Sequence, residues 1–488
     1  PHGVEDVRYA LCEDGLAPRA GRRLPRSEAR GGRITIFAAS VAQRWNRGPV
    51  LRAALMWEGL GHEWTPHMSD VGSGRPNRPF EAAIRDGSPG GRQDQHALGE
   101  TEVSEAFRDP AARRAVLGRY AKCFGPRLPD GAHLMLRLGA GARGAPVRRN
   151  ASWDTPCSVL RFANGELEHE FAQCALPVGT ARRWSARGRA ASRGRDHKAG
   201  AFVGAPLRLH AEIGFWADAG GGAPAVVPLE LCLVERPLLE LSMCTMPLYG
   251  LRELQQELPW ALEDWLEHHL GVLGMDHAEV YDADGSFGGA LGWQPGRPPA
   301  PGNASIAYHS EWPATLSAAM VDLSREHPSC SETWAYAHCL TKHRALSRWV
   351  VILHSPDEYL EAPAVSAGPF GGVSDVLERL REQTSKDVAK DDWLPFISVS
   401  SHAWAWGGPG ALAPADARAL RGGVMLGSRL RSRRPQIFTP VLDPGACTCA
   451  GPHVCYSSTS AFTHGGPRLQ VGVEALVMHH YVEMLARD

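Results

Sequence analysis

The sequence predicts an α/β domain over residues 231–488, preceded by β-rich accessory segments. From Leu231 onward, strand-like apolar runs alternate with helix-like segments, which is typical of an α/β domain. Before Leu231, short apolar runs are separated by stretches rich in Gly, Pro and Arg, which favours strands joined by turns. The chain has 488 residues, of which 43% are hydrophobic, so it can bury sizeable cores in more than one domain.

The N-terminal half divides into two predicted β-rich parts. Residues 1–125 mix short β-like runs, such as 33–37, with Gly-, Pro- and Arg-rich stretches, which indicates a loop-rich β module. Over residues 126–230, the apolar runs 134–138, 158–162 and 207–215 are spaced by turn-forming residues. That spacing predicts a β-sandwich.

The C-terminal part contains the clearest periodic segments. We predict helices from Pro259 and over 332–347 and 373–383, and strands over 238–248, 278–281, 349–353, 396–400 and 436–441, with an amphipathic stretch at 473–485. Acidic or polar residues follow two of these strands directly, at 282–286 and at 354–358. Ligands bind at the carboxyl ends of strands in α/β sheets, so both segments are candidates for a binding site.

Composition excludes some classes of function. The formal net charge is -1, and such a balance does not support the broad phosphate-binding surface that a nucleic-acid partner requires. The sequence has no run of about 18 apolar residues that would span a bilayer. The acceptor triplets beginning at Asn150 and Asn303 suit a chain of the secretory lumen.

The cysteines are grouped most densely near the C-terminus. Cys447, Cys449 and Cys455 surround His453, and thiolate and imidazole are preferred zinc ligands. The second C-x-x-C half of a zinc ribbon is missing, which favours a local disulfide over zinc. The total of eleven cysteines is odd, so in an oxidising compartment at least one thiol stays free or pairs with another molecule.

An acidic pair follows the strongly apolar run 349–353. Asp357 and Glu358 are placed where a nucleotide-sugar transferase needs carboxylates, because a divalent metal held there offsets the charge of the leaving diphosphate. A polar turn or a helix cap is the commoner explanation of such a pair, so its position alone does not establish a metal site.

Five blocks occur in a fixed order along residues 231–481. They are Met243-Cys244-Thr245, Trp265 to Gly271, Tyr281 to Ser286, Ala337-His338-Cys339 with Ser347 to Val350 and Pro356 to Tyr359, and Arg434 to Ile437 with His464 and His479-His480-Tyr481. In this order and spacing they resemble glycosyltransferase family 92, which includes plant galactan β-1,4-galactosyltransferases.

The resemblance implies a fold, an activity and a location. It implies a GT-A fold, which is a Rossmann-like α/β sheet, and inverting transfer of a hexose, commonly galactose, from a UDP-sugar to a glycan acceptor. It also implies Mn²⁺ or another divalent cation as cofactor, and an accessory β-sandwich that binds carbohydrate. Such proteins are type II membrane proteins of the Golgi or the secretory-pathway lumen, so a membrane anchor would lie in a segment before residue 1.

The resemblance and the strand positions together give the predicted site residues. The predicted donor-binding residues are Cys244, Thr245, Asp282, Asp284 and Glu358, the predicted metal ligands are Asp357, His354 and His464, and the candidates for the general base are Asp391 and Asp392. Trp393, Trp404 and Trp406 are either a stacking platform for acceptor sugars or packed core residues.

One departure from the family pattern affects the metal site. Ser355 stands where the family has the first Asp of its D-x-D motif, and a serine coordinates a hard cation weakly. Either His354, Asp357 and the C-terminal histidines hold the ion together, or the chain is an impaired relative that acts as a lectin-like glycan-binding protein. A zinc hydrolase is disfavoured because no H-E-x-x-H spacing occurs.

Overall fold

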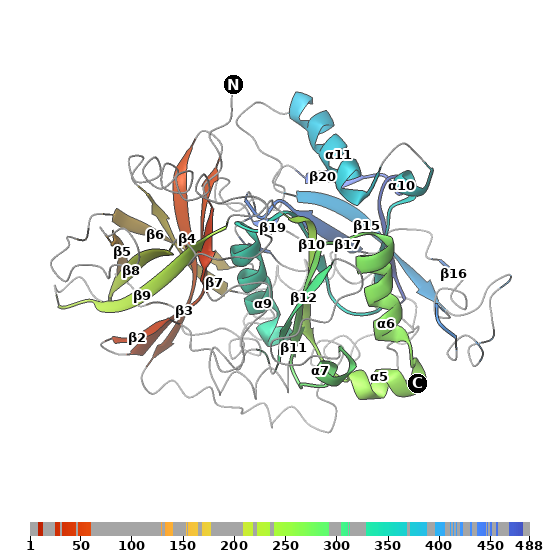
Figure 1. The fold of residues 1–488 in the computed structure, drawn as a ribbon, viewed down its shortest axis with the longest axis horizontal. Helices are drawn as coiled ribbons and strands as arrows, with labels where there is room; N and C mark the ends of the chain where they lie inside the picture. Colours follow the sequence, from red (N-terminus) through yellow and green to blue (C-terminus); the bar gives the residue numbers. More distant parts are fainter. Residues whose placement is uncertain are drawn as a thin grey trace, which may run out of the picture.

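The computed structural model consists mainly of strands. It describes most of residues 8–59, 128–234 and 239–481, and the longer gaps in this description are 13–24, 60–127, 140–152, 177–207, 292–303, 313–327, 388–395 and 457–467. Of the residues that the structure describes, 51% lie in strands and 23% in helices. A closed barrel and an open mixed sheet lie on either side of the long helix α9 (Pro328–His343), as Figure 1 shows.

The N-terminal half forms a closed eight-stranded antiparallel barrel. The strands follow the order β1-β9-β8-β5-β6-β7-β4-β3, and the barrel closes because β1 pairs with both β9 and β3. The strands are β1 (Tyr9–Leu11), β3 (Gly32–Arg44), β4 (Arg47–Gly59), β5 (His133–Leu138), β6 (Thr155–Ala163), β7 (Glu168–Ala175), β8 (Arg208–Trp216) and β9 (Ala225–Leu233), and β2 (Arg26–Ala29) extends the sheet beside β3. Buried residues alternate along β9, and a barrel of eight strands is just wide enough for such side chains to fill it.

The predicted β-sandwich is wrong, because strands from 1–125 and from 126–230 join in this one barrel. Strand β4 pairs with β7, and β1 pairs with β9, so the closing partners lie far apart in the sequence. The alternation of apolar and polar residues is the same in a sandwich and in a barrel. The pattern therefore predicts the strands but not the partners that close the sheet.

The C-terminal half forms a ten-stranded mixed sheet. Its main order is β12-β11-β10-β13-β17-β15-β21-β14, and β16 and β20 also pair with β15. The strands are β10 (Leu239–Leu248), β11 (His277–Asp282), β12 (Ser305–His309), β13 (Ser347–Leu353), β14 (Glu358–Glu361), β15 (Phe396–Ala405), β16 (Leu430–Arg431), β17 (Ile437–Leu442), β20 (Arg468–Val471) and β21 (Val477–His480). A separate hairpin joins β18 (Cys449–Ala450) and β19 (Cys455–Tyr456), and the Cys447–Cys455 disulfide beside it confirms the prediction of a local disulfide.

The predicted α/β Rossmann-like GT-A domain is also wrong. Strands β10 to β13 are parallel to one another, but β17 runs antiparallel to β13 and β15 runs antiparallel to β17, and the sheet forms half of a barrel. An α/β sheet needs a helix between successive parallel strands. From β15 onward the described elements are all strands except for isolated residues, and β15 has antiparallel partners (β16, β17) as well as parallel ones (β20, β21) with no described helix between them.

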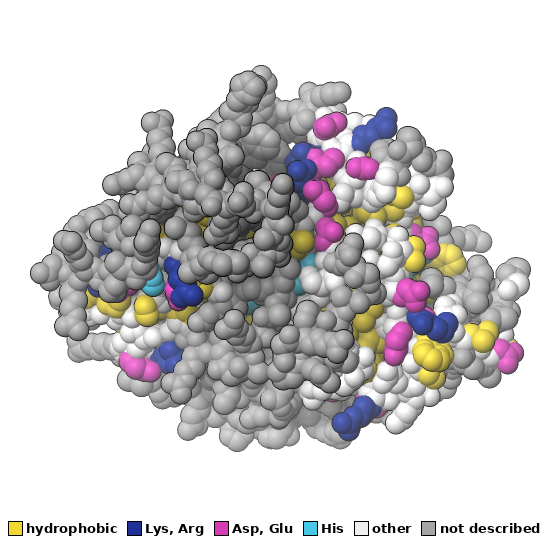
Figure 2. Space-filling model, in the orientation of Figure 1, with side chains coloured by type: hydrophobic (Ala, Val, Ile, Leu, Met, Phe, Trp, Pro, Cys, Tyr) yellow, Lys and Arg dark blue, Asp and Glu magenta, His cyan; other side chains and the backbone are white. Residues whose placement is uncertain are grey.

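Further helices pack on the face of the mixed sheet opposite α9. They are α5 (Leu251–Glu257), α6 (Ala261–Leu266), the π-helix η1 (Glu267–Val272), α7 (Phe287–Ala290), α10 (Pro363–Ala367) and α11 (Val373–Asp387). Leu262 and Trp265 pack with Val280 and Val351 on one face, opposite the face that α9 covers (Figure 1). Helix α11 buries Val373, Val376 and Leu377, and charged side chains lie over it on the face shown in Figure 2.

Helix α9 joins the barrel to the mixed sheet. Its residues Trp334 and Leu340 share one core with Phe37 of the barrel and Ile352 of the sheet. Just beyond the helix, Arg344 Nη1 donates a hydrogen bond to the carbonyl oxygen of barrel residue Val50 at 3.0 Å. The barrel and the sheet therefore share a continuous interior. Among the described residues, no helix is both long and apolar enough to cross a membrane.

Candidate functional site

The parallel strands β12, β11, β10 and β13 bring distant polar residues to one edge. Their carboxyl ends are in register, because Leu248 pairs with Asp282, Tyr281 pairs with His309, and Thr245 pairs with Leu353. Segments that are more than 100 residues apart in the sequence therefore end side by side. This edge is where parallel strands commonly bind ligands.

The turn after β13 places two predicted site residues in a fixed conformation. The backbone N–H of His354 donates to Glu358 Oε2 at 2.7 Å, and the N–H of Glu358 donates to the Ser355 carbonyl at 3.1 Å. The Ser355 hydroxyl donates to Asp357 Oδ1. Asp357 and Glu358 are only 3% and 4% exposed, so the turn holds both carboxylates at the base of the edge.

Helix α9 adds a third carboxylate, which was not among the predicted site residues. Glu332 Oε1 lies 3.4 Å from His354 Nε2, and Glu358 Oε1 lies 3.6 Å from His354 Nδ1, so the imidazole sits between two acids. Tyr336 donates to Glu332 Oε1 at 2.7 Å and fixes it; burial raises the pKa of Tyr336, and the charge of Glu332 raises it further. The only signal in the sequence was that Glu332 opens a predicted helix, which is not specific. We call Glu332, His354, Asp357 and Glu358 the strand-end cluster.

Asp282, at the end of β11, anchors a loop. Its Oδ1 accepts hydrogen bonds from the N–H groups of Asp284 and Gly285, and its Oδ2 accepts from the Phe287 N–H and from the Tyr308 hydroxyl at 2.6 Å. Burial raises the pKa of Asp282 to about 6, although the Tyr308 and Phe287 hydrogen bonds act in the opposite direction. These four hydrogen bonds occupy both carboxylate oxygens of Asp282. A UDP-sugar that contacted Asp282 would therefore have to compete with them.

Asp284 ties this loop to the end of β10. It accepts hydrogen bonds from the N–H of Gly250 at 2.9 Å and from the N–H of Ser286 at 3.0 Å. Burial acts to raise the pKa of Asp284, but the hydrogen bonds with Ser286 and Gly250 outweigh it and lower the pKa below its ordinary value. Gly250 has φ 70°, a left-handed conformation that favours glycine.

Cys244 and Thr245, the other predicted donor-binding residues, are buried inside β10. Cys244 forms a disulfide with Cys339 of α9, and the Thr245 hydroxyl accepts a hydrogen bond from the N–H of Tyr281 at 3.1 Å. Both side chains hold neighbouring elements together. Contact with a donor stays a prediction for these two residues.

Several predicted residues lie outside the described part of the chain. These are Asp391 and Asp392, the candidates for the general base, the predicted metal ligand His464, Trp393 and Trp406, and the side chain of His480. Trp404 is described, and its ring packs against His479 at 5.0 Å. His479 Nε2 lies 2.9 Å from Glu361 Oε2, so in the structure this imidazole faces Glu361 rather than Asp357.

The π-helix η1 supports the strand-end cluster from the other face of the sheet. His269 is fully buried; its Nδ1 donates to the Trp265 carbonyl at 2.8 Å, and its Nε2 accepts from the N–H of Leu360 in β14 at 3.2 Å. Trp265 Nε1 donates to the Glu358 carbonyl at 2.8 Å. Burial lowers the pKa of His269 to about 3, and the neighbouring His268 lowers it further, so the ring is neutral at pH 7. Two side chains of one helical segment therefore fix the backbone of β14.

A second polar cluster lies under the edge, around the fully buried Glu279 of β11. Glu279 Oε1 receives Lys342 Nζ at 2.5 Å, His277 Nε2 at 2.9 Å and His343 Nε2 at 3.1 Å. Its Oε2 lies 2.6 Å from His309 Nε2. Burial alone would raise the pKa of Glu279, but the Lys342 ammonium and the imidazoles outweigh it and hold the pKa well below its ordinary value.

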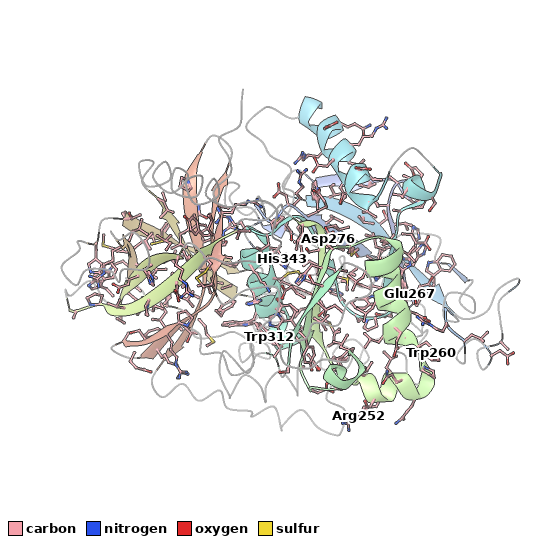
Figure 3. The ribbon with its side chains drawn as sticks, viewed as in Figure 1. Arg252, Trp260, Glu267, Asp276, Trp312 and His343 are labelled. Carbon is pink, nitrogen blue, oxygen red and sulfur yellow. A yellow bond between two sulfur atoms is a disulfide. The ribbon has the colours of Figure 1, made fainter. Side chains whose placement is uncertain are left out.

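The apolar run 278–281 predicted only a strand, so this cluster was missed. His277, Glu279 and Tyr281 alternate along β11, so they share the face that α9 covers. Figure 3 labels Trp312 and His343, which lie on that side of the sheet. A charged residue in the middle of an apolar strand was the available signal, because an acid is rarely buried without a partner.

Comparison of the chain with protein-family models, with curated proteins and with solved structures gives no match. The geometry of the site is therefore the basis for a function.

Proposed function

We propose that the chain is a glycosyltransferase that transfers a hexose, galactose in the first instance, from a UDP-sugar to a glycan acceptor with inversion. The donor would bind at the carboxyl ends of β10, β11 and β13, with its diphosphate beside the strand-end cluster. The proposal keeps the activity expected from the sequence but not the fold expected with it, since one activity occurs on different folds.

The observation that carries the proposal is that Glu332 and Glu358 flank His354, while Asp357 lies in the same turn as His354. Glu332 comes from α9, Asp357 comes from the turn after β13, and Glu358 is the first residue of β14. Three acids near one another repel unless a cation or a proton offsets their charge. A site that holds them at the end of a parallel strand suits a divalent cation with a bound diphosphate.

The strand-end cluster offers ligand types that Mn²⁺ accepts, but the His354 ring lies between Glu332 and Glu358, so these side chains would have to move together to bind one ion. Carboxylate oxygens suit Mn²⁺, which also accepts imidazole nitrogen, and the strand-end cluster offers both. Glu332 supplies a carboxylate in place of the one that Ser355 cannot provide, while Ser355 orients Asp357 through its hydroxyl. When bound, the ion would offset the charge of the leaving diphosphate.

The proposed reaction is a single displacement at the anomeric carbon. The oxygen of an acceptor hydroxyl forms a bond to this carbon while the bond to the diphosphate oxygen breaks, and a general base takes the hydroxyl proton. Asp391 and Asp392 stay the predicted candidates for that base.

The test is transfer or hydrolysis of UDP-hexoses by the full chain with MnCl₂. Asp357→Asn should lose the activity, whereas Glu474→Gln, a matched change at an exposed residue of the turn before β21, should keep it. Wild-type chain that neither binds nor turns over any UDP-sugar with Mn²⁺ present would refute the proposal.

A lectin-like glycan-binding protein is the second candidate, favoured by an aromatic surface on the barrel. The rings of His133 and Trp216 stack at 4.8 Å with an interplanar angle of 7°, and Trp153 meets Trp216 edge-on at 5.4 Å. Arg137 lies 4.2 Å over the Trp153 ring. Partly exposed aromatic rings with flanking polar groups suit the faces of sugar rings.

Ser355→Asp separates the two candidates. The new carboxylate would face Asp357, and a bound cation would relieve their repulsion. A large gain in donor turnover would indicate an impaired site that the wild type no longer uses. Unchanged turnover by an already active chain would indicate that Glu332 has taken over the role of the missing carboxylate.

The cysteines support a location in the secretory pathway. Cys12 pairs with Cys232, Cys157 with Cys174, Cys244 with Cys339, and Cys447 with Cys455. Disulfides persist in oxidising compartments, so the four pairs suit the Golgi lumen. Alkylation of free thiols before and after reduction, in protein purified from its natural compartment, tests this; full alkylation without reduction would exclude it.

A further inference from the structure

The Glu279 carboxylate presents two different environments to its two oxygens. Oε1 faces Lys342, His277 and His343, so a cation already lies against that oxygen. Oε2 lies 2.6 Å from His309 Nε2, and one ligand atom each from Glu279, His309 and His338 lies within 4.8 Å of the others. Ligands held at about 2.0–2.2 Å from one zinc ion lie at such separations after small movements.

The residues around Oε1, which we call the Oε1 group, are less suited to binding a metal ion than those around Oε2. His277, Glu279 and His343 also lie within 4.8 Å of one another, but the Lys342 ammonium is 2.5 Å from the shared oxygen. A metal ion there would meet a positive charge in a fully buried environment, where charge repulsion is strong. The same ammonium leaves Oε2 as the oxygen that a metal can approach.

Glu279, His309 and His338, which we call the Oε2 group, are held in position by their neighbours. The Tyr281 hydroxyl is hydrogen-bonded to His338 Nδ1 at 2.8 Å, so Nε2 is the nitrogen that an ion would take. The His309 ring stacks on Tyr281 at 4.6 Å, and Trp312 packs edge-on against His309 at 5.8 Å. Outer groups that orient a ligating imidazole are a regular feature of metal sites.

An ion can reach this group from the sheet edge. The His309 side chain is 12% exposed, whereas Glu279 is fully buried. His309 ends β12, beside the carboxyl end of β11. Two imidazoles and one carboxylate leave one position for water, which is the ligand set of open zinc sites.

We propose that Glu279, His309 and His338 bind a divalent transition-metal ion of the zinc class. This site is separate from the strand-end cluster and does not depend on the proposed transfer of sugar. Lys342 stays on Oε1 and sets which side of the carboxylate the metal occupies.

The test uses the full chain, stripped with a chelator, and the probes are Zn²⁺ by calorimetry and Co²⁺ by visible absorption. Wild type should bind Zn²⁺ and give the ligand-field bands of four-coordinate Co²⁺. Loss of an outer-shell partner costs roughly 10- to 100-fold in metal affinity, so His309→Gln and His338→Gln should each weaken binding by at least about 100-fold. Tyr281→Phe should weaken binding by about 10-fold and keep the Co²⁺ bands.

His210→Gln, on barrel strand β8, is the matched control and should bind as wild type does. His309 is partly exposed, so its variant should fold, and circular dichroism checks this. Absence of Zn²⁺ and Co²⁺ binding by the wild type overturns the proposal. Unchanged binding by a folded His309→Gln chain also overturns it, because the ion would then be held elsewhere.

Discussion

The buried imidazole of His269 makes stability depend on pH in a way that can be calculated. Burial lowers its pKa to about 3, whereas an unfolded histidine has a pKa near 6.5. The folded chain therefore favours the neutral ring. The stabilisation is fully present above pH 6.5 and is lost progressively as the pH falls from 6.5 toward 3.

The size of this loss follows from the pH interval. Between pH 6.5 and 4.5 the unfolded chain takes up a proton that the folded chain does not, at about 1.4 kcal/mol per pH unit. His269 should thus remove about 3 kcal/mol of stability by pH 4.5. His269→Gln abolishes this titration, so the variant should be less stable than wild type at pH 7.5 and should approach it at pH 4.5.

Denaturant unfolding of both proteins at the two pH values measures the effect. Val272→Gln, at a position of the same π-helix that is 72% exposed, is the control and should follow the wild type at both pH values. A difference in unfolding free energy between wild type and His269→Gln that is the same at pH 7.5 and 4.5 would refute the reasoning.

Three further predictions concern packing and loops. Cys339→Ser removes the disulfide to Cys244, which closes a loop of 95 residues, and should cost up to about 4–5 kcal/mol in unfolding free energy measured without reductant; no change would mean that the bond is not formed. Gly214→Ala would place a Cβ 2.7 Å from the Trp153 ring, so melting temperature should fall and tryptophan fluorescence should change, and neither should happen if the ring is not packed there. Burial raises the pKa of Asp282 to about 6, so this carboxyl stabilises the folded chain below about pH 4, and the stabilisation is lost as the pH rises through 6. Asp282→Asn should remove this pH dependence. The same change of melting temperature between pH 4 and pH 7 in the variant and the wild type would contradict the prediction.

Local elements could be predicted from the sequence because their periods are local. The strand expected over 238–248 is found at Leu239–Leu248, and the helix expected over 332–347 is found at Pro328–His343. The described part of the amphipathic stretch 473–485, up to residue 481, contains strand β21. Strand partners could not be predicted, because closing the barrel and bending the mixed sheet depend on pairings between distant segments.

The candidate site could be predicted only where its residues lie next to a strand in the sequence. Asp357 and Glu358 follow β13 directly, so their place at the sheet edge followed from the strand itself. Glu332 and His309 reach their clusters through α9 and β12, and no local pattern connects them to their partners. Glu279 was overlooked because the apolar character of the strand outweighed the one charged residue inside it.

The central claim is that a divalent cation and a nucleotide bind together at the strand-end cluster. The most direct test is a crystal structure of the full chain with MnCl₂ and UDP, with anomalous diffraction measured at the manganese edge. We predict an anomalous peak in contact with Asp357 and with Glu332 or Glu358, and a diphosphate bound to the same ion. A cluster closed by its own hydrogen bonds, with the manganese peak absent or far from these carboxylates, would contradict the account.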